Sequence, residues 1–103
     1  SLDSQLAKLA QLKAEDMAKN AYFSHTSPTY GSAFDMMKTY GVSYKTAGEN
    51  IAKGQKTAES VMNGWMNSSG HRANILRSDY TKIGVGYAKS ADGTTYWVQM
   101  FKD

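Results

Sequence analysis

The last third of the chain combines small and large side chains in a pattern that predicts a β-hairpin. Small residues occupy every second position of residues 84–88, and most positions of residues 95–101 are apolar or aromatic. Asp92-Gly93, between these segments, is a two-residue turn signal typical of a β-hairpin. With that turn, Trp97 lies opposite Ala88 and Phe101 opposite Gly84, so large side chains fill the space that small ones leave.

The opposite face of this predicted hairpin is apolar as well. It would carry Ile83, Val85, Tyr87, Val98 and Met100. A sheet that is apolar on both faces needs a covering layer on each of them. The sequence therefore predicts an α+β fold: an α-β-α sandwich with a small, mainly antiparallel sheet covered by helices on both faces.

Three other segments have the apolar spacing of helices. Leucine, alanine and methionine recur at intervals of three and four over residues 2–20, and Phe34 and Met37 predict a shorter helix that stops at Gly41. A third helix is predicted over residues 57–67, capped by Thr57. Its buried stripe is expected to be Ala58, Val61, Met62, Trp65 and Met66.

Two shorter elements are predicted between these helices and the hairpin. Ser68-Ser69-Gly70 ends the third helix, and residues 72–76 predict one further helical turn. Ile51, with Ala and Gly residues on either side, predicts a short strand that carries Glu49.

Length and composition predict one domain over residues 1–103, a monomer by default. The net charge is +3, but the lysines are scattered singly, which predicts a solvated surface and no nucleic-acid partner. The absence of cysteine excludes disulfides, thiolate metal sites and a cysteine nucleophile. No apolar run approaches the roughly 20 residues of a membrane span, and no signal peptide is present. Because the chain begins with Ser1 instead of Met, we expect a piece trimmed from a longer protein.

Two histidines and one carboxylate are the candidate functional residues. His25 and His71 lie in small, polar segments, and Glu49 lies almost midway between them in the sequence. Two imidazoles and a carboxylate would fill three positions around zinc and leave the fourth for water, which is the open geometry of a hydrolytic site. The chain has no HExxH helix and no evident second carboxylate as a base for that water. The alternative interpretation is that each histidine is a surface or capping residue.

Short polar residues lie close to both histidines in the sequence. Ser24 is adjacent to His25, and Ser68 precedes His71 by three residues, so a Ser-His pair is one reading of either segment. Capping or turn formation is the simpler role for these serines. Asn50 and Asn74 are expected to hydrogen-bond the loops around the site.

Five separated motifs resemble the CAP superfamily of cysteine-rich secretory, antigen 5 and pathogenesis-related class 1 proteins. In chain order they are Tyr22-Phe23-Ser24-His25, Gly48-Glu49-Asn50-Ile51-Ala52, Gly64-Trp65-Met66-Asn67-Ser68, Gly70-His71-Arg72-Ala73-Asn74-Ile75-Leu76 and Ile83-Gly84-Val85-Gly86-Tyr87. The chain is most similar to the cysteine-free bacterial branch, the SCP-like extracellular domains. The resemblance implies an α-β-α sandwich, secretion and a central cleft lined by two histidines and two acidic residues.

Carried over to this sequence, the resemblance implies that His25, His71 and Glu49 share this cleft. The second acidic residue of the family usually follows the helix tryptophan by three positions, and Ser68 stands there in this chain. The loss of that carboxylate is expected to weaken any divalent cation by tens-fold or more.

Three functions are compatible with these residues. The first is a non-enzymatic secreted domain whose cleft binds a divalent metal, zinc first among them, or a small ligand of the cell envelope. The second is a metal-assisted hydrolase acting on peptide or envelope polymer, which the missing second acid disfavours. The third, which the resemblance to eukaryotic members implies, is a carrier of lipid or sterol that needs an exposed apolar groove.

Overall fold

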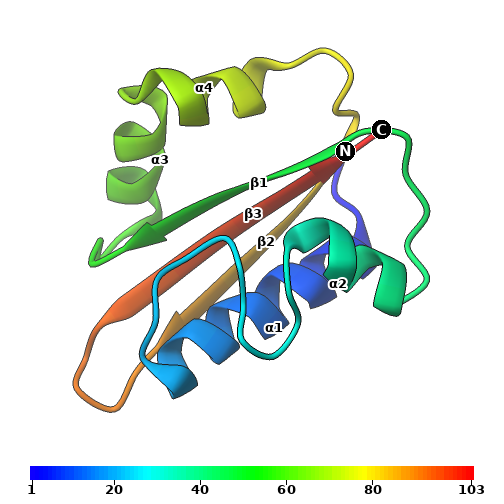
Figure 1. Cartoon of the computed structure of the whole chain (residues 1–103). Coiled ribbons are helices and arrows are strands. Elements are labelled where there is room, and N and C mark those ends of the chain that lie inside the picture. Colours follow the sequence, from blue (N-terminus) through cyan, green and yellow to red (C-terminus); the bar gives the residue numbers. More distant parts are fainter.

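A computed structural model describes residues 1–103 as three layers, with a sheet between two pairs of helices (Figure 1). The elements in chain order are α1 (Ser4–Asn20), α2 (Ala33–Thr39), β1 (Ala47–Lys53), α3 (Ala58–Met66), α4 (Ser69–Leu76), β2 (Lys82–Lys89) and β3 (Thr95–Lys102). The strands are antiparallel in the order β1-β3-β2. The predicted sandwich, with its strand around Glu49, is therefore confirmed. No helix is long and apolar enough to cross a membrane.

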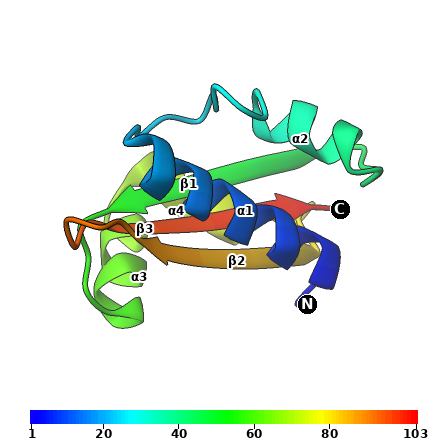
Figure 2. The ribbon, with the colours of Figure 1, turned by 90° about the horizontal axis from the view of Figure 1, so that it is seen from below.

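The helices α1 and α2 cover one face of the sheet, with α1 across β2 and β3 and α2 beside β1 (Figure 2). The apolar stripe of α1 is buried in the main core, together with Val98 and Met100 of β3. The helix begins at Ser4, later than the predicted residue 2, because Asp3 caps it by accepting a hydrogen bond from the Leu6 N–H. Leu2 pairs instead with Ile83 at the edge of β2.

The predicted hairpin register is wrong by one residue. The Ser90 N–H donates to the Thr94 carbonyl at 2.8 Å, so the loop is one residue longer than a tight Asp-Gly turn. Gly93 adopts a φ of +88°, as expected for the left-handed position of such a longer loop. Ala88 therefore pairs with Tyr96 instead of the predicted Trp97.

This shift changes which side chains share a face. Gly84 pairs with Met100, and Gly86 with Val98, so both glycines face α1 beside these large residues. A Cβ on Gly84 would lie 2.1 Å from the Leu6 carbonyl carbon, and one on Gly86 2.3 Å from that of Ala10. The helix backbone, and not Phe101, occupies the space that the glycines leave.

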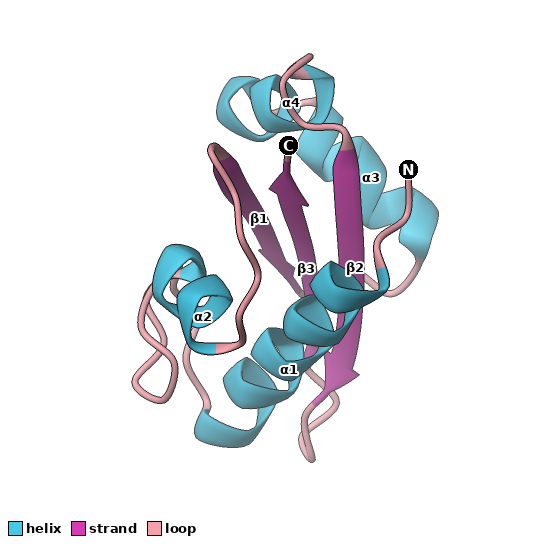
Figure 3. Cartoon of the chain, turned by 90° about the vertical axis from the view of Figure 1, so that its right-hand side faces the viewer, coloured by secondary structure: helices cyan, strands magenta, loops and turns pink.

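The third layer, α3 and α4, lies on the face of the sheet opposite α1 (Figure 3). It contacts β1, and Trp97 of β3 packs against it. Val61 and Trp65 of the predicted stripe are buried, in a small cluster with Ala52. The rest of the stripe prediction is wrong: Ala58 and Met62 are exposed and Met66 is half-buried, because α3 contacts the sheet along a narrow line only. The outer face of β2 is thus partly open, with Val85 46% and Tyr87 41% exposed.

Two helix ends also differ from the sequence prediction. A capping box at Ser32 starts α2 at Ala33, and Gly41, at a φ of +72°, follows its end as predicted. The segment predicted as one turn is the longer helix α4, because Ser69 and Gly70 are already helical.

Candidate functional site

The candidate residues come from three different layers. His25 lies in the loop between α1 and α2, Glu49 on the edge strand β1, and His71 in the first turns of α4. The His25 loop is shaped by local hydrogen bonds: the Ser24 hydroxyl accepts from the Thr26 N–H at 3.1 Å, and Ser27 pairs with Gly31 through the backbone. Ser24 therefore has the turn-forming role.

His25 and Glu49 form a close pair. The Nδ1 atom of His25 is 2.8 Å from Oε1 of Glu49. The Glu49 side chain is only 3% exposed, whereas that of His25 is 60% exposed. The second oxygen of Glu49, Oε2, is buried without a hydrogen-bond partner. A buried, unpaired carboxylate oxygen is costly, so it marks a place where a donor or a cation would be stabilised.

His71 pairs with Ser68. Its Nδ1 atom is 2.9 Å from the Ser68 hydroxyl oxygen. Ser68 is the N-cap residue of α4, yet its side chain makes no capping hydrogen bond, because it contacts His71 instead. The structure thus contains one of the Ser-His pairs considered from the sequence. No carboxylate hydrogen-bonds His71, so the orienting third group of a hydrolytic triad is missing.

Asn50 joins β1 to α4. Its amide nitrogen donates to the His71 carbonyl and to Gln99 Oε1, both at 3.1 Å, and its amide oxygen accepts from Asn74 at 2.9 Å. Both asparagines hydrogen-bond around the site, but their partners lie on α4 and the strands and not in the loops that the prediction named. Asn50, with an exposed fraction of 0%, fixes the backbone that carries His71.

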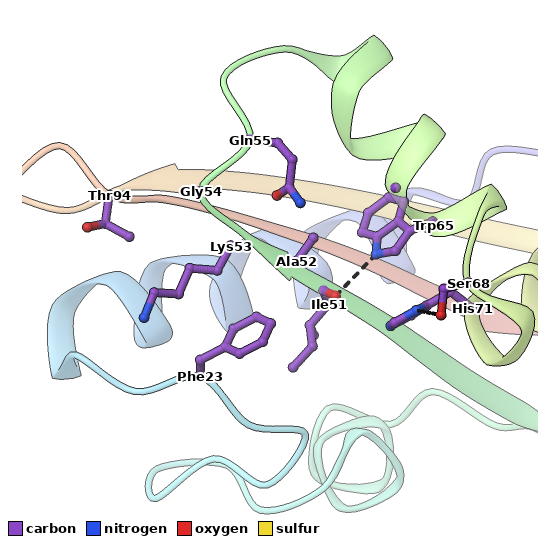
Figure 4. A pocket seen from close by; sticks show the side chains of 11 residues that line it. Phe23, Ile51, Ala52, Lys53, Gly54, Gln55, Trp65, Ser68, His71 and Thr94 are labelled. Carbon is purple, nitrogen blue, oxygen red and sulfur yellow. Dashed lines mark hydrogen bonds between the residues drawn. The ribbon is translucent and has the colours of Figure 1, made fainter.

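The edge of β1 that faces away from β3 lines a partly apolar cavity beside this network. Three side chains, from α3, from α4 and from the loop after α4, donate to alternate carbonyls of that edge: Trp65 to Ile51 at 3.1 Å, Asn74 to Glu49 at 3.4 Å, and Tyr80 to Ala47 at 2.9 Å. The cavity measures about 490 Å³ and lies between Phe23 on one side and Trp65 on the other, with His71, Ser68 and Gln55 on its wall (Figure 4).

His25 and Glu49 do not line this cavity. They line a smaller one of about 220 Å³, next to Phe34. No group of three or more His, Cys, Asp or Glu side chains lies close enough to hold a metal ion. The structure thus joins Glu49 to His25 and Ser68 to His71, and places the two pairs in separate cavities.

Two buried charged residues next to His25 were not among the predicted site residues. Lys13 of α1 is 2% exposed and donates to the His25 carbonyl at 3.0 Å. Burial lowers the pKa of Lys13, and the negative charges of Glu49 and Asp16 partly oppose that shift. The sequence signal was present: Lys13 lies four residues after Leu9 and four before Met17, on the apolar stripe of its helix.

Asp16 is 7% exposed and accepts four side-chain hydrogen bonds. The donors are Asn20, Tyr22, Ser27 and Thr29. Although burial raises the pKa of Asp16, these donors together hold it below its ordinary value. Burial and the contact with Asp16 raise the pKa of Tyr22 well above its ordinary value.

Comparison with known proteins agrees with this fold. The chain is 59% identical over 100 residues to the uncharacterized protein YkwD of Bacillus subtilis, a match that covers 97% of this chain but 38% of that protein. It superimposes with a TM-score of 0.88 on an extracellular SCP-domain protein of Bacillus anthracis, at 38% identity, covering 99% of this chain and 33% of the other. With an outer surface protein of Borrelia burgdorferi the TM-score is 0.90 at 26% identity, over 100% of this chain and 76% of the other.

The chain thus spans little more than a third of the length of its Bacillus subtilis relative. Over residues 1–101 it matches the family described as CAP, the cysteine-rich secretory protein family. Four of the five motifs that carried the resemblance contribute residues to the walls of the two cavities, and the fifth lies on β2, which lines neither. The chain belongs to the CAP family.

Proposed function

We propose that the chain is a ligand-binding domain of the cell envelope whose cavity beside His71 binds a small molecule with an apolar part and a hydrogen-bond donor. The extracellular and outer-surface descriptions of its structural relatives support a location outside the cytoplasm. The volume of about 490 Å³ lies in the usual range of small-molecule sites.

One observation carries the proposal: Gln55 is one of the residues that line the cavity, and its side-chain oxygen is buried without a hydrogen-bond partner. A ligand N–H or O–H would satisfy this oxygen, while Phe23 and Trp65 flank the apolar part. A pure hydrocarbon would leave the oxygen unpaired, which disfavours the lipid-carrier function for this cavity. Hydrolysis is disfavoured as well, because His71 lacks an orienting carboxylate.

The test is a titration with aromatic amides, beginning with benzamide, followed by nuclear magnetic resonance. We expect shifts clustered at Phe23, Gln55 and His71. Phe23→Ala should weaken binding about tenfold, the scale of losing one apolar contact in a pocket. Phe34→Ala is the matched control, because both phenylalanines are 46% exposed but Phe34 lines only the other cavity. The proposal is contradicted if millimolar benzamide shifts no resonances, or if Phe23→Ala and Phe34→Ala weaken the binding of benzamide equally.

A divalent cation is the second candidate, and the unpaired Glu49 Oε2 beside His25 is the observation that favours it. These two side chains fall short of the three protein ligands of a catalytic zinc site, so we derive no hydrolytic step. A titration with zinc, followed by the nuclear magnetic resonance signals of the two histidines, distinguishes two possible positions of the cation. A cation at Glu49 shifts the resonances of His25 alone, whereas the three-residue cleft predicted from the sequence shifts those of both histidines. No shift of either excludes zinc.

A further inference from the structure

The edge of β1 that faces away from β3 carries backbone N–H groups without a partner. The bond from the Gly54 N–H to the Thr95 carbonyl, together with the register, shows that the even-numbered residues of β1 bond to β3. In an antiparallel ladder the alternate residues, Glu49, Ile51 and Lys53, then direct both backbone groups away from β3. None of these three N–H groups donates a hydrogen bond within the chain.

The carbonyl groups of the same edge are satisfied instead. Those of Ala47, Glu49 and Ile51 accept from the three side chains described above. A strand added to this edge needs its acceptors as well as its donors, so an extended peptide would have to displace all three side chains. The edge therefore offers donors only, and its complement is a ligand that brings one acceptor to it.

Two of the unpaired N–H groups belong to residues that line the larger cavity, Ile51 and Lys53. Ile51 is only 6% exposed, and an unpaired N–H on a buried residue is rare, so it marks a place where an acceptor would be stabilised. The unpaired side-chain oxygen of Gln55 lies on a residue of the same cavity. The Gln55 backbone is fixed, because its carbonyl accepts from Thr95 at 2.6 Å and from Trp97 at 2.8 Å. The cavity thus combines unpaired donors with an unpaired acceptor.

We propose that this cavity recognises an isolated secondary amide, the N-acyl group of an acylated amine. The ligand carbonyl accepts from the N–H of Ile51 or Lys53, and the ligand N–H donates to Oε1 of Gln55. The apolar substituent lies between Phe23 and Trp65 (Figure 4). This inference rests on the proposed function of the cavity and adds the acceptor and the chemical class of the ligand.

Two probes of similar size test the acceptor. Acetanilide has a carbonyl and an N–H, whereas N-ethylaniline keeps the ring and the N–H but has no carbonyl. We expect acetanilide to bind about fivefold more tightly, the scale of one net hydrogen bond. In nuclear magnetic resonance spectra it should also move the amide proton of Ile51 or Lys53 downfield. Glu49 is the internal control, because its N–H lies on the same edge but Glu49 does not line this cavity.

Gln55→Met tests the ligand N–H, since it removes the side-chain acceptor and keeps a side chain of similar length. It should weaken acetanilide about fivefold, again the scale of one net hydrogen bond. It should not weaken N-methylacetanilide, which has no N–H to donate. Gln5→Met, at an exposed glutamine of α1, is the matched control and should leave both affinities unchanged.

The outcomes distinguish this proposal from the function on which it rests. If neither acetanilide nor N-ethylaniline shifts the resonances of the cavity residues, both are overturned. If the two compounds bind equally well, or if acetanilide binds without moving Ile51 or Lys53, the N-acyl proposal is overturned and the binding function stands. A blocked hexapeptide that shifts the amide protons along the whole of β1 would demonstrate strand addition, which also overturns the N-acyl proposal.

Discussion

The side-chain amide of Gln11 pairs with the backbone of Tyr87 as a neighbouring strand would. Its Nε2 donates to the Tyr87 carbonyl at 2.8 Å, and its Oε1 accepts from the Tyr87 N–H at 3.0 Å. Asp3 and Ser1 pair with Ile83 further along the same edge. A helix residue and the start of the chain thus satisfy the free edge of β2 at Tyr87 and Ile83, which limits pairing with other molecules there.

Gln11→Ala tests this protection of the edge. Water replaces the lost partner at the exposed Tyr87, so we expect a loss of about 0.5–1.5 kcal/mol in the free energy of unfolding. Urea unfolding measures that loss, and light scattering at high concentration should show increased association. Gln5→Ala, on an exposed and unbonded glutamine of α1, should change neither quantity.

Gly84→Val tests the close approach of α1 to the sheet. A Cβ on Gly84 would meet the Leu6 backbone at 2.1 Å, so the helix must move, and we expect a loss of about 3 kcal/mol, the upper end of ordinary overpacking. Thermal unfolding measures the change. Gly70→Ala has open space around its new methyl group and should instead stabilise α4 by about 0.5–1 kcal/mol. A raised midpoint for Gly84→Val is incompatible with the packing described.

Gly84 illustrates which features of the hairpin could be predicted from the sequence and which could not. Small residues facing a covering layer were predictable from the alternation along β2, and the direction of the effect is unchanged. The register was not predictable, because Asp92-Gly93 fits both a tight turn and the longer loop that Ser90 and Thr94 close. The one-residue difference decides whether Val98 shares a face with Gly86 or lies behind it.

The identities of the candidate site residues were predictable from the sequence, but their arrangement in space was not. The motifs singled out His25, Glu49, His71 and Ser68, and two of the contacts among them are present. Their separation into two cavities depends on which side of the β1 edge each residue lies, and a sequence motif carries no such information.

Asp16→Asn tests the buried carboxylate through pH. The folded-state pKa of Asp16 is lowered, so its ionised form contributes stability above the unfolded-state pKa of about 3.9, and that contribution is lost as pH falls below this value. We expect the variant to be about 1.5–3 kcal/mol less stable at pH 7, the scale of hydrogen bonds to a charged group. Paired urea titrations at pH 7 and pH 3 should show this difference shrinking in acid. A difference that is constant with pH would mean that the charge of Asp16 does not contribute.

Ser68→Glu tests whether the wall of the larger cavity can hold a cation once a carboxylate stands where the family usually has one. Ser68 lines that cavity and contacts His71, so the new side chain starts next to an imidazole. We expect zinc to bind about tenfold more tightly than to the unaltered chain, the lower end of the effect of an added metal-site contact. Because Ser68 makes no capping hydrogen bond, the change should cost less than the ~1 kcal/mol of a lost N-cap. Calorimetric titration with zinc gives the affinity.

Ser69→Glu is the control, since it adds the same charge at the neighbouring exposed residue, which does not line the cavity. If both variants gain equally, the gain reflects net charge alone and Ser68 is not in a position to direct a carboxylate toward His71.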